Sequence, residues 1–446
     1  MQIQTLALDN FRRFAHFEME FEPDLTLINA RNGKGKTTVL EAATIALQPF
    51  VGTLMPGQSA SIKQPDARYL PTKGFEREQD FPVAVTATFA NPNVQSRREL
   101  RKPNGRTTSV DTHELTEYAN DLLDKIRADR TAVELPVVAY YSSKRLFALH
   151  SDSSSKIARQ SRTVGYQDCL SALSNFKQLQ QWMATATRAQ LQEEQRKTGA
   201  AGIAALHKRV QGIENAVDSV LADEGWTGFH YSLYFEELAI SHPDHGLMPI
   251  SVLSDGTRAM VSLVADLAKR ASQLNPDYGE NAAELASGIV LIDEVDLHLH
   301  PEWQQRVVPS LQATFPNIQF IISTHSPQVL SSVPSKHIRV LEQDEDQQWH
   351  ARIPEEEVVG LPSYEALQKV MKVDPRPPGE AADALKEYTH LIESGNQNSE
   401  EGLRLRDELV RRYGPHHRVL VDADRLIKLQ EFKRRRAAHT VKVEDA

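Results

Sequence analysis

Residues 24–47, DLTLINARNGKGKTTVLEAATIAL, decide the fold of this chain. The apolar stretch at residues 24–29 has the pattern of a strand, and residues 37–47 have that of a helix. Between them lies a turn that contains Gly33 and Gly35, which can adopt the positive φ angles that other residues avoid. A strand, a glycine-rich turn and a helix in this order predict a phosphate-binding loop.

The loop, residues 30–37, carries the groups that phosphate needs. Its backbone N–H groups can turn inward at the glycines, Lys36 reaches the outer phosphates, and Thr37 can ligate Mg²⁺. The helix that follows adds the positive end of its dipole. Ala30 stands where the motif usually has its first glycine, and we expect strain there because alanine disfavours positive φ. The residues predicted to bind nucleotide here are Asn32, Gly33, Lys34, Gly35, Lys36, Thr37 and Thr38.

A second stretch, residues 288–294 (GIVLIDE), places two carboxylates at the end of an apolar strand. In P-loop enzymes the first acid, here Asp293, holds Mg²⁺ through water or the threonine. The second, Glu294, is placed to polarise the attacking water. An N-capping pair of acids is the alternative, but the phosphate loop requires such a strand. We therefore predict ATP and Mg²⁺ as cofactors, with Thr37 and Asp293 on the metal and Glu294 as a catalytic residue.

A third stretch, residues 253–258 (LSDGTR), opens a helix upstream of the acidic strand. In this position it resembles the signature of ABC ATPases, whose loop binds the γ-phosphate of ATP held by the opposite subunit. Ser254 and Gly256 match the family pattern, whereas Asp255 replaces a common glycine and brings a carboxylate near the phosphate. The resemblance implies that all three residues bind nucleotide across a dimer.

Two further residues extend the resemblance. His325, in residues 323–327 (STHSP), follows the last apolar strand and takes the place of the family histidine that contacts the γ-phosphate, so we count it as catalytic. Arg12, in residues 10–14 (NFRRF), resembles the N-terminal arginine motif of recombination and chromosome ATPases. It would touch a phosphate, and a solvent-facing arginine is the alternative.

These motifs predict an α/β fold, an ABC-type P-loop ATPase head with a mainly parallel central sheet. Continuous apolar runs at residues 288–292 and 319–323 are typical of parallel strands buried on both faces. Alternation in residues 2–8 and 17–21, together with a strand-like stretch at residues 81–90, predicts an antiparallel N-terminal β-subdomain.

The head is expected to cover residues 1–350, with an inserted loop at about 50–80. A short helical subdomain is expected at about 161–225, where residues 161–221 look helical with a break near Gly199 and Gly202.

A C-terminal helical extension is predicted at residues 355–446. Its amphipathic stretches at 381–392 and 403–413 have apolar stripes too narrow for an independent core, so we expect them to pack on the head, a sister subunit or a partner. Residues 419–424 (VLVDAD) mimic the paired aspartates of a nuclease domain but fit a helix better, so no intrinsic nuclease is expected.

Composition narrows the classes of function. The 446 residues carry a formal net charge of −9, so nucleic-acid binding would need local patches or a partner. The single cysteine, Cys169, excludes an internal disulfide framework and a cysteine zinc cluster, which fits a reducing cytoplasm. His298 and His300 have a spacing that does not favour a metal site. We find neither a signal peptide nor an apolar run of about 20 residues, so no membrane association is expected.

Three more stretches are similar to a group of bacterial ATPases that includes the ATPase subunit of Septu-type and retron-linked antiphage systems. They are residues 135–141 (LPVVAYY), 161–170 (SRTVGYQDCL) and 374–378 (DPRPP). The group is related to the overcoming-lysogenization-defect and RecF-type heads. The resemblance implies a homodimer or higher homo-oligomer, a separate HNH endonuclease as partner, and contact with DNA through the complex.

Two alternatives stay open. One is a RecF-type repair ATPase that acts on DNA directly, for which the basic residues would supply the surface. These are Arg97, Arg98, Arg101, Lys102 and Arg106, and the run at residues 433–436. The other is a transporter ATPase, which the C-terminal helical extension disfavours.

Overall fold

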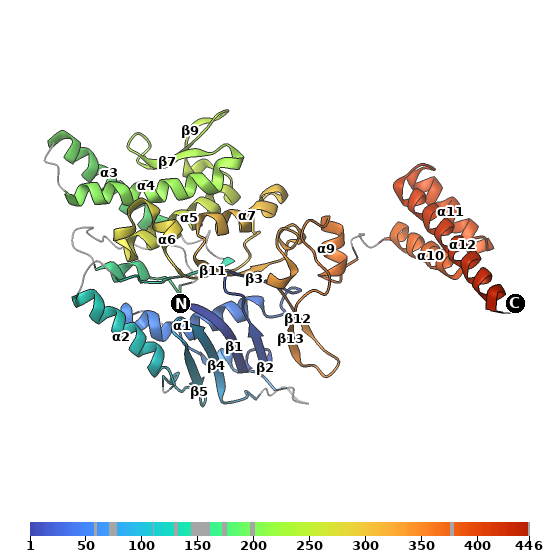
Figure 1. Ribbon diagram of the computed structural model, residues 1–446, viewed down its shortest axis with the longest axis horizontal. Coiled ribbons are helices and arrows are strands. Elements are labelled where there is room, and N and C mark those ends of the chain that lie inside the picture. The colour runs from blue at the N-terminus through green and yellow to red at the C-terminus, as the bar shows by residue number, and fades with distance from the viewer. Residues whose placement is uncertain are drawn as a thin grey trace. The chain divides into compact units, whose positions relative to one another are not determined.

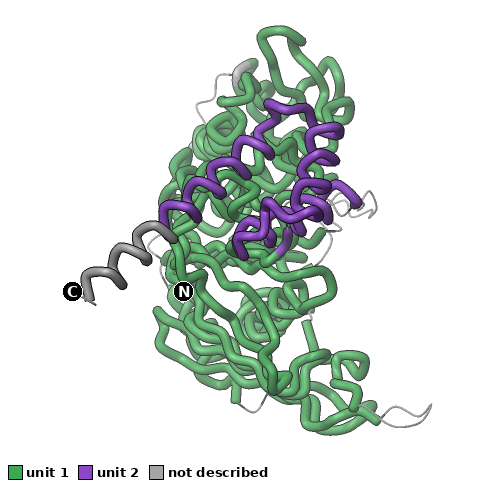
Figure 2. Tube along the Cα trace, turned by 90° about the vertical axis from the view of Figure 1, so that its right-hand side faces the viewer, with its two compact units in different colours: residues 1–372 green, residues 373–446 purple. Residues whose placement is uncertain are grey.

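The structure is a computed structural model that describes residues 1–57, 60–70, 78–109, 111–128, 133–143, 161–171, 176–196, 201–374 and 379–444. These residues form two compact units, unit 1 (Met1–Lys372) and unit 2 (Val373–Ala446), which Figure 2 distinguishes by colour. The predicted helix break at Gly199 and most of the 374–378 stretch lie outside the described residues.

A six-stranded sheet forms the centre of unit 1, in the order β13-β12-β3-β11-β10-β6. Its strands run parallel except for β13, which pairs antiparallel with β12. Every residue of β3, β6, β10 and β11 is buried, as expected for predominantly apolar parallel strands that are covered on both faces. The prediction of a mainly parallel sheet is confirmed. The strands span Leu25–Asn29 (β3), Val137–Tyr141 (β6), Gly288–Ile292 (β10), Ile318–Thr324 (β11), Ile338–Gln343 (β12) and Trp349–Arg352 (β13).

An antiparallel sheet in the order β2-β1-β4-β5 precedes the central one and confirms the N-terminal β-subdomain. Helix α1 (Lys36–Leu54) contacts both sheets, through β4 and β5 on one side and β11 on the other. Figure 1 shows α1 between them. The strands of this sheet span Gln2–Phe11 (β1), Phe14–Glu20 (β2), Val83–Ala90 (β4) and Val94–Leu100 (β5).

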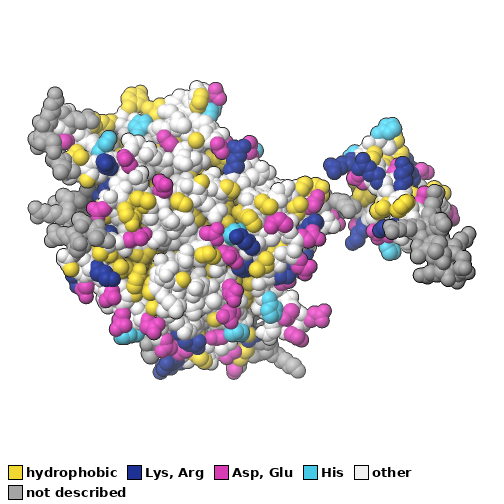
Figure 3. All heavy atoms as spheres, in the orientation of Figure 1, with side chains coloured by type: hydrophobic (Ala, Val, Ile, Leu, Met, Phe, Trp, Pro, Cys, Tyr) yellow, Lys and Arg dark blue, Asp and Glu magenta, His cyan; other side chains and the backbone are white. Residues whose placement is uncertain are grey.

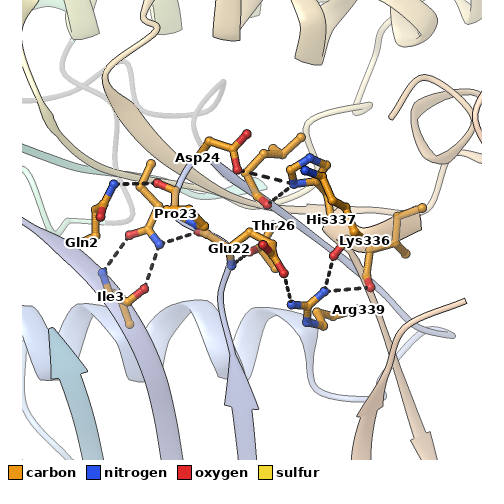
Figure 4. A network of polar contacts seen from close by, with 12 residues as sticks. Gln2, Ile3, Glu22, Pro23, Asp24, Thr26, Lys336, His337 and Arg339 are labelled. Atoms are coloured by element: carbon orange, nitrogen blue, oxygen red, sulfur yellow. Dashed lines mark hydrogen bonds and ion pairs between the residues drawn. The ribbon is translucent and has the colours of Figure 1, made fainter. Parts of the chain in front are cut away.

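Buried polar side chains join the two sheets (Figure 4). Gln319 on β11 is fully buried; its amide nitrogen donates to the carbonyls of Ile3 and Glu22, and its amide oxygen accepts from the N–H of Ile3, each at 2.8 Å. Arg339 on β12 donates to the Glu20 carbonyl at 3.1 Å and to the Glu22 carboxylate at 2.8 Å. These bonds fix the chain just before β3, and therefore the entry to the phosphate loop.

The other helices of the head lie mainly on the opposite side of the central sheet from the first sheet, together with a small antiparallel sheet of β7, β8 and β9 (Figure 1). The helices span His113–Ala128 (α2, which packs on α1), Phe176–Arg196 (α3), Ala201–Leu221 (α4), Asp255–Leu274 (α5), Ala282–Leu285 (α6) and Pro301–Thr314 (α7). The small sheet is built from Thr227–Ser232 (β7), Glu237–His242 (β8) and Gly246–Pro249 (β9).

Two boundaries differ from the sequence expectation. Residues 50–54 do not belong to a loop but continue α1, because Phe50, Val51 and Leu54 add a buried apolar stripe to it. Residues 161–171 are not α-helical: they form a 3₁₀ helix at Arg162–Tyr166 followed by turns. A tertiary contact explains this, since Arg270 on α5 donates to the carbonyls of Gly165 and Gln167 and holds them out of helical pairing.

Unit 1 ends after Lys372 rather than near residue 350. Helices α8 (Pro327–Leu330) and α9 (Ser363–Lys369) pack on each other, and Val358 and Val370 join the core of the head. The segment 353–372 therefore belongs to the head. No helix among the described residues is both long and apolar enough to cross a membrane.

Unit 2 consists of α10 (Glu380–Ser394), α11 (Glu400–Tyr413) and α12 (Arg418–Glu444). We expected its helices to need an outside surface, and this was wrong. The third helix supplies Leu420 and Ala423 to a core shared with Tyr388, Ile392 and Leu409. Each stripe is narrow, but three stripes together enclose a small core. Residues 419–424 lie within α12, which confirms their helical prediction.

Candidate functional site

The phosphate loop connects β3 to α1 with the backbone geometry that the glycines predict. Gly33 has φ +70° and Gly35 has φ +106°, both in the region that favours glycine. A Cβ atom on Gly35 would also collide with the ring of Phe14. Ala30 is buried and has no positive φ, so the expected strain at this position is absent. Glycine is therefore required at two loop positions and dispensable at the third.

Lys36 points back over its own loop. Its ammonium group donates to the Ala30 carbonyl at 3.0 Å and lies 2.5 Å from Nε2 of His325. Burial lowers the pKa of Lys36, while the nearby carboxylates of Asp293, Glu294 and Asp296 act to raise it. The loop thus holds a partly desolvated cation, whose attraction for a phosphate is stronger than it would be in bulk water. The three carboxylates work against that attraction, and a bound Mg²⁺ would offset their charge.

The other loop residues differ in what they can offer. Lys34 extends its ammonium group over the Trp349 ring, 5.4 Å from the centroid, and its N–H donates to the Arg31 carbonyl. Asn32 is exposed and Thr38 is buried in the first turn of α1.

Asp293 and Thr37 come together at the ends of β10 and the loop. The Thr37 hydroxyl donates to one carboxylate oxygen of Asp293 at 2.9 Å, and the Ser323 hydroxyl donates to the other at 2.5 Å. Asp293 is almost fully buried, with 1% of its surface exposed. A hydroxyl and a carboxylate are hard oxygen donors of the kind that Mg²⁺ prefers, so these residues fit a magnesium ion.

Glu294 follows directly, with φ +50°. A positive φ is uncommon for a residue with a side chain and occurs where the surrounding structure enforces it. Here the Glu294 N–H donates to Ser323 at 2.8 Å, so the same hydroxyl that contacts Asp293 also fixes the backbone of Glu294.

His325 is held by the segment that follows the acidic strand. The Asp296 carboxylate accepts hydrogen bonds from the Thr324 hydroxyl at 2.6 Å and from the His325 N–H at 3.3 Å. Burial and the neighbouring Lys36 lower the pKa of the imidazole. Neutral His325 can therefore accept a hydrogen bond from the Lys36 ammonium group at Nε2.

Arg12 is engaged by carboxylates. Its guanidinium donates to Asp66 at 2.9 Å and lies 2.5 Å from Glu41, which is one turn beyond Thr37 on α1. About a third of the side chain is exposed. The phosphate contact predicted for Arg12 stays a prediction, because in this structure two acids occupy its guanidinium.

The signature residues form the exposed start of α5. Ser254 is the N-cap and accepts from the Thr257 N–H at 3.2 Å. Gly256 lies so close to the segment after the acidic strand that a Cβ atom there would collide with the carbonyl oxygen of His298. The Asp255 carboxylate pairs with Arg258 at 2.5 Å, which offsets the negative charge that this departure from the family pattern introduces.

Four residues near the site were missed by the sequence analysis. Ser323 and Asp296 position Asp293, Glu294 and His325, and Glu41 and Asp66 bind Arg12. Ser323 and Asp296 could have been noticed, because polar residues next to the motifs at strand ends belong to the same edge of a parallel sheet.

Tyr140 on β6 is a further buried neighbour, for which the apolar run gave no signal. Its hydroxyl has no hydrogen-bond partner among the described residues.

The alternative sites receive no support from the described residues, which contain no group of three or more His, Cys, Asp or Glu side chains able to hold a metal ion. His300 instead caps α7, accepting weakly from the Glu302 N–H at 3.4 Å. Asp424 pairs with Arg406 and Asp422 with Arg425 on the surface of unit 2.

A phosphate loop after β3, an acid pair after β10 and a histidine after β11, with a capped signature turn on α5, define the class of this protein as an ABC-type P-loop ATPase head. Residues 31–331 match the family described as "AAA domain, putative AbiEii toxin, Type IV TA system". The match covers more than half of the chain, and the chain belongs to this family.

Curated relatives come from bacterial defence elements. The chain is 24% identical to "Retron Vc95 probable ATPase" of Vibrio cholerae, over 89% of this chain and 85% of the relative. It is 39% identical to "Retron Ec83 probable ATPase" of Escherichia coli, over 41% of this chain and 32% of the relative. It is 36% identical to "Septu protein PtuA" of Bacillus mycoides, over 30% of this chain and 18% of the relative. The chain thus aligns with most of one relative and with less than a third of the other two.

Solved structures with a similar fold include an SMC head bound to the C-terminal winged-helix domain of ScpA. The two structures share a TM-score of 0.48 and 16% sequence identity, over 79% of this chain and 98% of the other.

Proposed function

We propose that this chain binds and hydrolyses ATP with Mg²⁺ between two copies of itself, as the ATPase subunit of an antiphage defence complex. One observation carries the proposal. Lys36, Asp293 and His325 follow three neighbouring parallel strands and are linked by contacts of 2.5 to 2.9 Å through Thr37 and Ser323. The crevice at the carboxyl ends of such strands is where open α/β sheets bind ligands.

Each residue has a role that its chemistry supports. Lys36 and the N–H groups at Gly33 and Gly35 would hold the phosphates, and Thr37 and Asp293 would hold Mg²⁺, which neutralises charge that develops on the phosphates. Glu294 would orient the attacking water as general base. His325 would exchange its contact with Lys36 for one with the γ-phosphate. Asn32, Lys34, Thr38 and Arg12 would complete the nucleotide site.

The dimer is proposed because the signature turn is exposed. Ser254 and Asp255 lie on the surface at the positive end of a 20-residue helix, and such an end attracts an anion. A second copy that presents its own ATP would supply that anion. The pairing of Asp255 with Arg258 leaves the turn able to approach a phosphate despite the extra carboxylate.

The defence role rests on the relatives, two retron ATPases and a Septu protein. We propose that this chain works in the cytoplasm beside a separate HNH endonuclease, which it controls through its ATP state, and that it meets DNA through that complex.

A RecF-type repair ATPase is the second candidate, favoured by 31% identity over 106 residues to a RecF protein of Heliobacterium modesticaldum. The basic cluster near residue 100 argues against it. Arg98 is buried and donates to the carbonyls of Ile45 and Ala60, while Arg97 and Arg101 pair with Glu99. On the face of unit 1 in Figure 3, Lys and Arg side chains are scattered among Asp and Glu. Side chains 434–436 of the second cluster lie outside the described residues.

Glu294→Gln tests the reaction. The change keeps the side-chain shape and removes the carboxylate that orients water, so ATP should still bind while turnover falls by about a hundredfold or more. Binding is measured by calorimetry and turnover by phosphate release. The exposed Glu284→Gln on α6, which removes an equivalent charge outside the site, is the matched control.

Turnover at the wild-type level in Glu294→Gln would remove Glu294 from catalysis. The partner is tested by co-expression with an HNH endonuclease encoded beside the gene: Glu294→Gln should alter its DNA cleavage in cells and abolish protection against phage. Full protection by this variant would contradict the link between hydrolysis and defence.

A further inference from the structure

A cavity of about 490 Å³ lies between the 3₁₀ segment at 162–166, α3, β7 and the second half of α5, all on the helical side of unit 1 (Figure 1). Its volume falls within the range of about 300–1,000 Å³ that is usual for small-molecule sites. None of its lining residues belongs to the phosphate loop, the acidic strand or the signature turn. It is therefore distinct from the ATP site.

The charge of this cavity has one sign. Lys177 and Arg188 from α3 and Lys269 and Arg270 from α5 line it, and the described lining includes no aspartate or glutamate. Arg209 adds a further cation behind the wall, where its guanidinium lies over the Trp182 ring, 5.5 Å from the centroid. Clefts lined by a single sign of charge concentrate ligands of the opposite sign.

Asp266 and Arg270 form a closed structural group beside the cavity. The guanidinium of Arg270 donates to Asp266 at 2.7 Å and to the carbonyls of Gly165 and Gln167 at 2.8 and 2.9 Å. The same carboxylate oxygen of Asp266 accepts from the Tyr141 hydroxyl at 3.0 Å. This acid and this arginine therefore neutralise each other and hold the 3₁₀ segment on α5.

Lys269 is different from Arg270. Its side chain is more than nine-tenths buried, with 8% exposed, and within the described part of the chain its ammonium group has no hydrogen-bond partner. A lysine that served only to balance Asp266 would bond to that carboxylate, yet the second oxygen of Asp266 is also without a partner. Burial lowers the pKa of Lys269 to about 8. The negative charge of Asp266 compensates this desolvation only in part, and an anion in the cavity would offset the cost that remains.

The other residues that line the cavity carry groups suited to binding a nucleoside. Five glutamines contribute amides, which carry both donors and acceptors as base edges do. Trp182 and Tyr231 are buried and supply apolar walls. We propose that this cavity binds a small phosphorylated ligand of the nucleoside monophosphate class, with the phosphate on Lys269. This site goes beyond the ATPase function proposed above and does not depend on it.

Calorimetry on the purified full chain tests the site, with AMP as the probe and adenosine as the uncharged control. AMP lacks the outer phosphates that Lys36 is placed to hold, so its binding should be unchanged in Lys36→Ala. Lys269→Met, which keeps the length of the side chain, should weaken AMP binding by about tenfold or more. The exposed Lys125→Met on α2 is the matched control and should bind AMP as the wild type does.

Arg188→Gln, at the exposed rim of the cavity, provides a second test in case the Lys269 variant does not fold. This change should weaken AMP binding several-fold. A 5′-phosphorylated trinucleotide offers the same group at a strand end; tighter binding than AMP, lost in Lys269→Met, would support the site and assign its phosphate to a strand end. No AMP binding by the wild type, or equal binding by Lys269→Met, would overturn the inference. Binding lost in Lys36→Ala but kept in Lys269→Met would place AMP in the ATP site, which overturns the inference and leaves the ATPase proposal intact.

Discussion

Single residues of the ATP site are tuned by their neighbours, and the contact between Lys36 and His325 is the clearest case. Each group is partly buried, and the pKa of each is lowered, so both resist carrying a charge in this place. The contact persists because only the lysine is charged and the neutral imidazole accepts its hydrogen bond. Protonation of the His325 imidazole would place a second cation in contact with Lys36, and only the nearby carboxylates would offset the two charges.

This arrangement predicts a pH dependence of stability. The folded chain binds the His325 proton less readily than the unfolded chain, whose histidine has the ordinary pKa of 6.5. The unfolded state therefore takes up more protons as the pH falls through 6.5 and below, and the free energy of unfolding decreases. His325→Gln, which cannot titrate, should lose less stability than the wild type between pH 8 and pH 5.5.

Urea denaturation at the two pH values measures the difference. The exposed His207→Gln on α4 should follow the wild type. An identical pH dependence in His325→Gln and the wild type would show that His325 is not the titrating group.

Whole elements reach the site through close backbone approaches, and one of these is at the start of α5. Gly256 has no room for a side chain because the His298 carbonyl lies against it. His298 itself has φ +64°, so neither backbone can move without cost. The signature turn is therefore fixed on the segment that also carries Asp296, the residue that holds His325.

Gly256→Ala should lower the free energy of unfolding by about 1–3 kcal/mol, as overpacking does, and should reduce ATP turnover. Gly202→Ala on α4 is the matched control, because a Cβ atom there meets nothing within 4 Å. Because Gly202 lies at the start of α4 and not in its interior, this change should leave the free energy of unfolding the same or slightly raised, by at most about 0.5 kcal/mol. Urea denaturation compares the two variants, and equal stability would show that α5 is free to shift.

At the scale of the whole molecule, two questions concern assembly: whether two heads form a dimer, and what unit 2 binds. The signature turn at the start of α5 is exposed on the head, whereas unit 2 encloses its own core. Unit 2 also exposes the apolar side chains of Leu403, Val421, Leu429 and Phe432. We propose that these contribute to a surface for the nuclease or for a second ATPase dimer.

Mixing two inactive variants tests the head dimer. Lys36→Ala should weaken ATP binding roughly ten- to hundredfold by removing a charge-assisted contact, and Ser254→Arg should block the signature turn. In a mixed dimer one site has both its own Lys36 and the partner subunit's Ser254 intact, so each mixed dimer should regain about half of the wild-type turnover. A 1:1 mixture in which subunits exchange at random, where about half of the dimers are mixed, should then reach about a quarter. Turnover by a strictly monomeric form, or no recovery on mixing, would contradict a site shared between subunits.

Truncation after Lys372 tests unit 2. Among the described residues, the core of the head includes none beyond 372, so the shortened chain should fold and bind ATP as the full chain does. Its co-purification with the nuclease, or its assembled mass by light scattering, should fall. Unchanged values of both would exclude unit 2 as the assembly surface and direct attention to residues 50–80.

The sequence by itself indicated the buried strands β3, β10 and β11, the phosphate loop and the edge where the acids and His325 lie, whereas the strands β12 and β13 were not predicted. Each depends on a local signal: an apolar run, glycines with positive φ, or a polar residue at the end of a buried strand. Because parallel strands place their carboxyl ends at one edge, these local signals combine without knowledge of the rest of the chain.

Only the tertiary structure decided which groups far apart in the chain meet. It brought Asp66 and Glu41 to Arg12, placed Gly256 against His298, and turned residues 161–171 away from a helix through Arg270. It also left Lys269 without a hydrogen-bond partner among the described residues, in a cationic cavity, and closed a core in unit 2. Such contacts depend on where separate elements come to rest, and the pattern within any one element cannot specify its neighbour.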